Sequence, residues 1–175
     1  VSSLGQYVRP TQIPPFTRQP GTNEMSGYLT VVLTDINEFW SEMYQRAGLK
    51  STEGKPFETY LKYYWLDKGQ VVQSGCKAAT DIRSMFYCPG DDTMYLSIPA
   101  MLPDGTGTLL PGDKTHLATG EGSAISTIAH EYAHNIQEEL GVNPAMDVHA
   151  MELEADCIAG VYLRGGINLD SGTNR

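Results

Sequence analysis

Two histidines four residues apart, with a glutamate next to the first, are the residues of this sequence best suited to chemistry. The segment reads His130-Glu131-Tyr132-Ala133-His134. Residues four apart lie one turn above each other on the same face of an α-helix, so both imidazoles can bind one zinc ion. Glu131 faces the same side, where it can take a proton from a zinc-bound water and pass it to a leaving amine. The alternative is an ordinary helix surface with two histidines and a solvated glutamate.

A catalytic zinc ion needs a third protein ligand and one open position. Glu152 and Asp156 are four residues apart and share a helix face. We expect Glu152 to be the third ligand and Asp156 to orient a ligand histidine through its other ring nitrogen. Glu154 points roughly the opposite way, where we expect a solvated surface charge.

Two helices must bring these residues together. The first is predicted over residues 122–140, with Gly141 just past its end. Asn143 and Pro144 supply an N-cap and a first-turn proline for the second helix, which ends near Gly165. Because the connection is only a few residues long, we expect the two helices to lie close to antiparallel.

The rest of the pattern predicts a long helix and a small sheet. Apolar residues recur at steps of three and four from Met25 to Ala47, which is typical of a core helix. Short strand-like runs are separated by Gly, Pro and Asp, and they cover residues 60–66, 70–73, 83–87 and 93–98. Residues 99–120 read as a long irregular loop. We therefore expect an α+β fold with a small antiparallel sheet packed on helices.

Length and charge restrict the class of protein. The 175 residues fit one domain, and four prolines mark residues 1–23 as an N-terminal arm. We expect the domain to cover residues 24–165 and a tail to cover 166–175. The net charge of −9 disfavours nucleic-acid binding. No apolar run reaches the length of a membrane span, and the start at Val1 suggests a processed or trimmed end, before which a signal or anchor could have stood.

The three cysteines raise the question of a disulfide bond. Cys76 and Cys88 flank a turn-rich stretch, so a disulfide joining adjacent strands suits their spacing; two free core thiols are the alternative. A disulfide would indicate an oxidising, extracytoplasmic compartment, for a secreted or membrane-anchored protein. Cys157 follows Asp156 in the second predicted helix, and we expect it to pack in the core.

The two helical motifs resemble those of the bacterial neutral zinc metallopeptidase family. The resemblance rests on HEYAHNIQ at residues 130–137 and ELEADCIAGV at residues 152–161. Residues 86–96 are similar to the strand that precedes the active-site helix in that family, and the likeness extends over about residues 24–165. The resemblance implies a zincin fold with a glutamate as the third zinc ligand, which falls on Glu152.

Peptide hydrolysis also needs a group that stabilises the developing oxyanion. His149 lies one turn before Glu152 on the same side of the helix and is the first candidate, with a surface histidine as the alternative. The weaker candidates are Tyr95, His116 and Tyr162. The strand at 93–98 could offer a free edge on which an extended peptide adds as a further strand.

These observations predict a zinc-dependent metallopeptidase that acts on peptides or proteins. His130, His134 and Glu152 would bind one zinc ion, and Glu131 would activate the zinc-bound water. One alternative is a catalytically weak or inactive zinc-binding module that binds a partner at the cell surface. Another is a metal-dependent hydrolase of non-peptide amides or esters, which a zinc site alone does not exclude.

Overall fold

The computed structural model describes residues 22–49, 62–66, 69–80, 85–101, 121–142 and 147–165. The elements are α1 (Thr22–Ala47), β1 (Lys62–Leu66), β2 (Val71–Gln73), β3 (Ala78–Thr80), β4 (Met85–Cys88), β5 (Thr93–Ser97), α2 (Ile98–Met101), α3 (Glu121–Glu139) and α4 (Val148–Gly165). The α+β class and the three long helices are as predicted. The arm up to residue 21, the loop at 102–120 and the tail at 166–175 lie outside the described residues, and the domain boundaries stay predictions.

The three-stranded sheet is mixed, so the prediction of an antiparallel sheet is wrong for β1. The order is β1-β5-β4, with β1 parallel and β4 antiparallel to β5. The strands β2 and β3 form a separate antiparallel pair. Because β5 is paired on both sides, the expected free edge at residues 93–98 is also wrong. Among the described strands, the edges of this sheet are β1 and β4.

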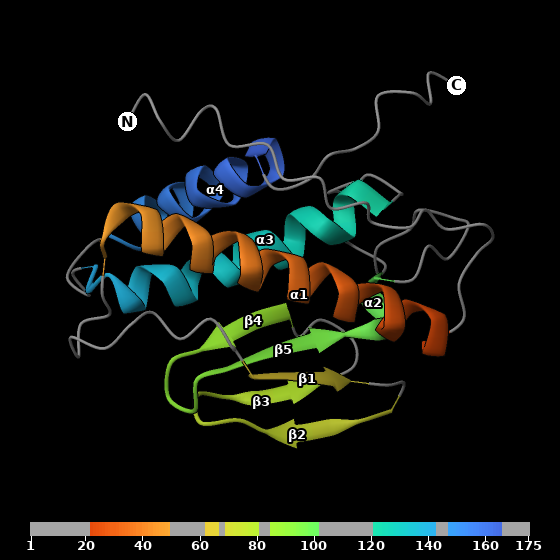
Figure 1. Ribbon diagram of the computed structural model, residues 1–175. Helices are drawn as coiled ribbons and strands as arrows, with labels where there is room; N and C mark the ends of the chain where they lie inside the picture. Colours follow the sequence, from red (N-terminus) through yellow and green to blue (C-terminus); the bar gives the residue numbers. More distant parts are fainter. Residues whose placement is uncertain are drawn as a thin grey trace.

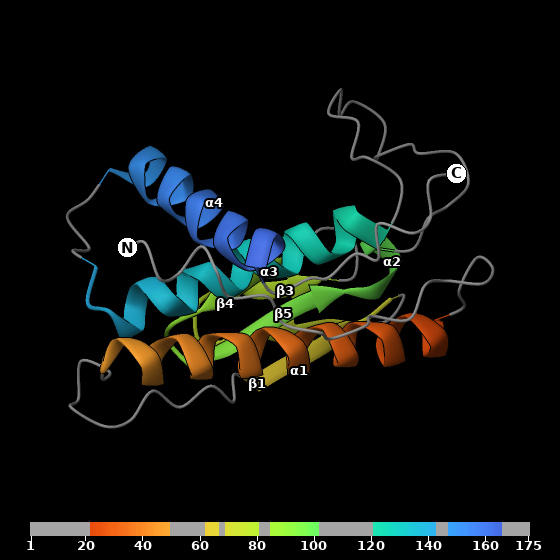
Figure 2. The same cartoon turned by 45° about the horizontal axis from the view of Figure 1, so that its top comes forward.

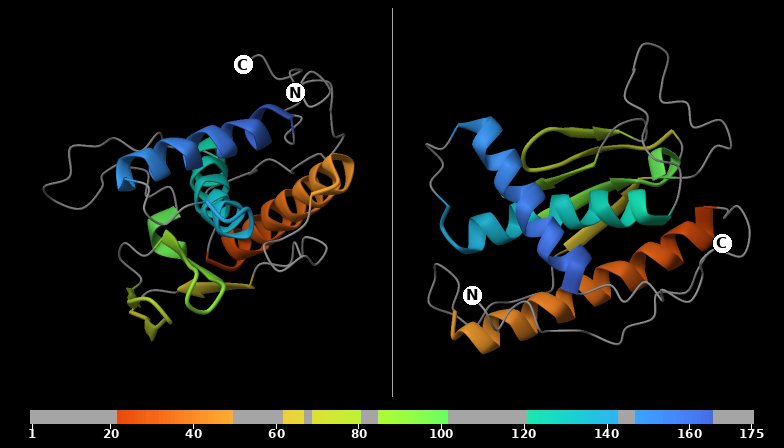
Figure 3. Two further views of the ribbon diagram at one scale, coloured as in Figure 1. Left: turned by 90° about the vertical axis from the view of Figure 1, so that its left-hand side faces the viewer. Right: turned by 90° about the horizontal axis from the view of Figure 1, so that it is seen from above.

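The long helices lie on one side of the strands (Figure 1). The helices α1 and α3 run in the same direction (Figure 2), and α3 lies between α4 and the sheet. The chain reverses between α3 and α4, but α4 crosses α3 obliquely (Figure 3), so the expected near-antiparallel arrangement is wrong. Both helices bury alanines, which allow a close approach at such a crossing: Ala129 and Ala133 on α3, and Ala155 and Ala159 on α4.

The core is a cluster of apolar side chains contributed by α1, the sheet, α3 and α4. Two hydrogen bonds between buried side chains cross this core. The Tyr132 hydroxyl donates to Asn37 Oδ1 at 2.6 Å, and the Tyr162 hydroxyl donates to Asp35 Oδ2 at 2.7 Å. A buried polar group that loses its partner is costly, so these bonds fix how α3 and α4 sit on α1. None of the described helices combines the length and apolar character needed to cross a membrane.

The cysteines follow the prediction in part. Cys76 and Cys88 form the expected disulfide, which joins the turn between β2 and β3 to the end of β4. Cys157 is exposed instead of packed in the core. The buried side of α4 carries Ala155, Ala159 and Tyr162, and Cys157 falls between the first two on the opposite side of the helix.

Removal of the disulfide tests its contribution to stability. The Cys76→Ala/Cys88→Ala variant should lose about 3 kcal/mol of unfolding free energy in urea denaturation, because the bond closes a loop of sequence separation 12 in the unfolded chain. Reductant should lower the stability of the wild type to that of the variant and leave the variant unchanged. A loss below about 1 kcal/mol would contradict this account.

Candidate metal centre

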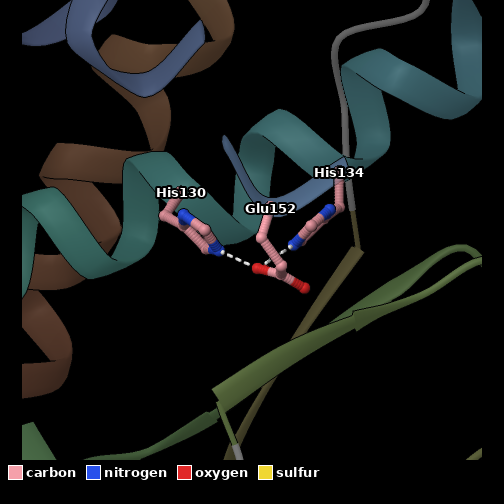
Figure 4. A group of neighbouring side chains, drawn as sticks. All are labelled: His130, His134 and Glu152. Carbon is pink, nitrogen blue, oxygen red and sulfur yellow. Dashed lines mark hydrogen bonds and ion pairs between the residues drawn. The ribbon is translucent and has the colours of Figure 1, made fainter. Parts of the chain in front are cut away.

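Side chains from α3 and α4 converge on one point (Figure 4). His130 Nε2 lies 3.0 Å from Glu152 Oε2, and His134 Nε2 lies 3.6 Å from the same oxygen. One potential ligand atom of each residue lies within 4.8 Å of the others. Ligands at about 2.0–2.2 Å from a tetrahedral zinc ion are roughly 3.3 Å apart. The spacing therefore allows these three residues to hold a metal ion.

The outer ring nitrogens of both histidines face hydrogen-bond acceptors. His130 Nδ1 lies 2.8 Å from Asp156 Oδ1, and His134 Nδ1 lies 2.8 Å from Gln137 Oε1. Each Nδ1 must carry the proton to satisfy such an oxygen, which leaves the Nε2 lone pair free. Two lone pairs and the carboxylate of Glu152 then face one another. Acceptors arranged in this way fit a bound cation.

Gln137 is a residue of this site that the sequence analysis missed. Its side chain is 5% exposed, and its amide nitrogen donates to Met151 O at 2.8 Å and to Glu154 Oε2 at 3.1 Å. Gln137 thus connects the His134 ring to α4. The expectation that Glu154 is a solvated charge is wrong, because it is only partly exposed and accepts this bond. The position of Gln137, three residues after His134 on the same helix face, was the available signal.

Glu131 lies between the candidate ligands and the sheet. The Tyr87 N–H on β4 donates to Glu131 Oε2 at 3.2 Å. Burial raises the pKa of Glu131 to about 7, while the charge of His130 and the bond from Tyr87 act in the opposite direction. A carboxyl group that exchanges its proton near neutral pH suits general acid–base chemistry.

A cleft of about 620 Å³ includes this group of residues in its wall. Its lining comes from α3, from the start of α4, from Met85, Phe86 and Tyr87 on β4, and from Lys77 on the β2–β3 turn. The volume is in the range of small-ligand and substrate sites. The edge strand β4 therefore forms one wall, and the metal-ligand candidates form the other.

Of the proposed oxyanion donors, those within the described residues do not line the cleft. His149 is exposed on the first turn of α4, and its catalytic role stays a prediction. The Tyr95 hydroxyl donates to Asp91, and the Tyr162 hydroxyl donates to Asp35 in the core. His116 lies outside the described residues.

A histidine–glutamate–histidine helix that meets a glutamate of the next helix defines a candidate metal centre of the kind found in zinc hydrolases. The chain belongs to the family described as "Putative neutral zinc metallopeptidase", whose model matches residues 5–166. This confirms the resemblance seen in the sequence.

The chain is similar to curated proteins of several bacteria. "Uncharacterized protein YpfJ" of Escherichia coli (strain K12) is 26% identical over 159 residues, which are 82% of this chain and 49% of that protein. "Uncharacterized protein Rv2575" of Mycobacterium tuberculosis (strain H37Rv) is 33% identical over 108 residues, 55% of this chain and 33% of that protein. The matched regions thus span half or less of these relatives. No solved structure matches the chain.

The Gln137→Leu variant tests the role of Gln137 in positioning His134. Without the acceptor on His134 Nδ1, we expect zinc affinity to fall roughly ten- to hundred-fold, measured by competition with a chromophoric chelator. Glu154→Ala is the matched control, because it removes only one acceptor of Gln137 and leaves the bond to His134. An unchanged zinc affinity in a folded Gln137→Leu protein would contradict the role.

Proposed function

We propose that the protein is a zinc-dependent metallopeptidase that hydrolyses peptide bonds. The observation that carries this proposal is the convergence of His130, His134 and Glu152, with Glu131 beside them in the same cleft. Membership of the zinc metallopeptidase family supports it. One zinc ion held by the three residues would act as a Lewis acid toward the scissile carbonyl and make a water molecule more acidic.

Glu131 is the proposed general base and acid. The N–H of Tyr87 holds its Oε2, so the carboxyl group has a fixed position in the cleft. Burial raises its pKa to about 7, so the carboxyl group can both accept and return a proton at neutral pH. In this mechanism Glu131 takes a proton from the attacking water and gives it to the amine that leaves.

The remaining hydrogen bonds of the proposed site act on the histidines. Asp156 and Gln137 each occupy an Nδ1 atom and hold the ring so that Nε2 faces Glu152. This assignment makes Asp156 and Gln137 positioning residues that do not touch the substrate. The zincin-like architecture belongs to the same proposal, supported by the ligand helices and by the sheet edge beside them.

An extended substrate would lie along β4. This strand is the edge of the three-stranded sheet on the side of α3, and three of its residues line the cleft. Main-chain groups at a sheet edge bind an extended peptide as a further strand. We therefore propose that the peptide binds along β4. The strand β5, for which the sequence predicted this role, is central in the sheet.

The disulfide supports an extracytoplasmic location. Disulfide bonds persist in oxidising compartments and are rare in the cytosol. We propose that the Cys76–Cys88 bond forms in the compartment where the protein acts.

The Glu131→Gln variant tests the mechanism. It should bind zinc with the same stoichiometry as the wild type and lose at least about a hundred-fold in peptide cleavage, because it cannot accept the proton. The assay is digestion of a peptide library and of a denatured protein, with and without a chelator, together with metal analysis. Glu138→Gln is the matched control, since Glu138 also lines the cleft and accepts a hydrogen bond from the Tyr87 hydroxyl.

Retained cleavage in the Glu131→Gln variant would contradict the mechanism. If the zinc-loaded wild type hydrolyses esters or non-peptide amides but no peptides, the result would favour the alternative of a metal-dependent hydrolase of non-peptide substrates. No hydrolysis of any substrate would favour the zinc-binding module.

A further inference from the structure

Among the described residues, Lys77 is the only lysine or arginine that lines the cleft. Its Nζ lies 4.1 Å from the centroid of the Phe86 ring, and Phe86 lines the same cleft. The charge of Lys77 also lowers the pKa of Glu131, against the larger rise from burial. A cation from the β2–β3 turn therefore lies beside Phe86 of β4, in the cleft that the candidate metal ligands also line.

The backbone of Lys77 is fixed by hydrogen bonds within the 74–77 turn. The Ser74 hydroxyl accepts from Cys76 N at 3.1 Å and from Lys77 N at 2.9 Å, and it donates to Lys77 O at 2.6 Å. Ser74 N donates to the same carbonyl oxygen at 3.2 Å. Both polar backbone groups of Lys77 are thus bonded to one residue.

The 74–77 turn is attached both to β4 and to the segment that follows it. The Cys76–Cys88 disulfide joins the turn to the last residue of β4, and Gly75 N donates to Asp91 Oδ2 at 2.7 Å. A Cβ atom on Gly75 would lie 2.9 Å from the carbonyl carbon of Gly90, so only glycine fits there. These contacts hold the base of the Lys77 side chain at a set distance from β4.

The ammonium group of Lys77 keeps its capacity for hydrogen bonds. Within the described stretches no ion pair involves Lys77, and its recorded partner is the face of the Phe86 ring. An aromatic face attracts a cation but does not accept a directional hydrogen bond from it as a carboxylate oxygen does.

We infer that Lys77, held over the Phe86 ring, forms a subsite that binds a carboxylate group of the substrate. The inference rests on the proposed peptidase function, because it assigns a group of the peptide to one wall of the proposed active-site cleft. The Lys77 ammonium donates hydrogen bonds to the carboxylate, while the buried Phe86 ring, which stacks on Tyr95, holds the ammonium in the cleft wall. The carboxylate comes either from an acidic side chain or from a free peptide C-terminus.

Binding of matched peptides to the zinc-loaded Glu131→Gln protein tests the subsite without turnover. One pair of fluorescent peptides has blocked ends and differs by Asp against Asn, and a second pair differs by a free or amidated C-terminus. Lys77→Met should weaken binding of the carboxylate member about tenfold and leave its amide counterpart unchanged, while Lys77→Arg should retain the preference. The pair that responds identifies the source of the carboxylate.

Lys62→Met is the matched control, because it removes the same charge from β1, at the opposite edge of the sheet from β4. Its peptide affinities should equal those of the parent protein. Equal affinity of the parent for both members of each pair, an equal loss for both in Lys77→Met, or no binding of any peptide would overturn the inference. Failure of the proposed function has a different signature: Lys77-dependent binding would persist, but protein with Glu131 intact would cleave no peptide.

Discussion

The crossing of α3 and α4 is the constraint on which the candidate site depends. His130 and His134 project from one helix and Glu152 from the other, with Nε2–Oε2 distances of 3.0 and 3.6 Å. A shift of one helix by a single residue is about 1.5 Å, which is enough to spoil such a ligand set. Hydrogen bonds from Tyr132 and Tyr162 to α1 resist that shift from the core side.

The sheet side of the cleft is held by a separate set of contacts. The disulfide and the 74–77 turn fasten Lys77 to β4, and the N–H of Tyr87 on β4 fixes Glu131. Substrate groups proposed to meet Lys77 and Glu131 would thus be positioned by the same strand. The sheet would thus take part in the proposed chemistry, although all three candidate metal ligands come from α3 and α4.

Helix periodicity made much of the site predictable from sequence, because a spacing of four residues decides which side chains share a face. The features that failed depend on long-range packing. The parallel pairing of β1 with β5 joins strands that are distant in sequence, and no local pattern encodes it. The exposure of Cys157 and the partial burial of Glu154 depend on which side of α4 meets α3. The spacing of three residues places Gln137 on the helix face of His134, but its bonds to α4 depend on the packing of the two helices.

The central claim is that His130, His134 and Glu152 hold one zinc ion. Zinc X-ray absorption spectroscopy on the purified protein, with metal quantification, tests it most directly. The account predicts one zinc per chain, with two imidazole nitrogens among nitrogen and oxygen ligands at about 2.0–2.2 Å, and loss of this signal in Glu152→Ala. A sulfur ligand, or an unchanged spectrum and zinc content in Glu152→Ala, would contradict it.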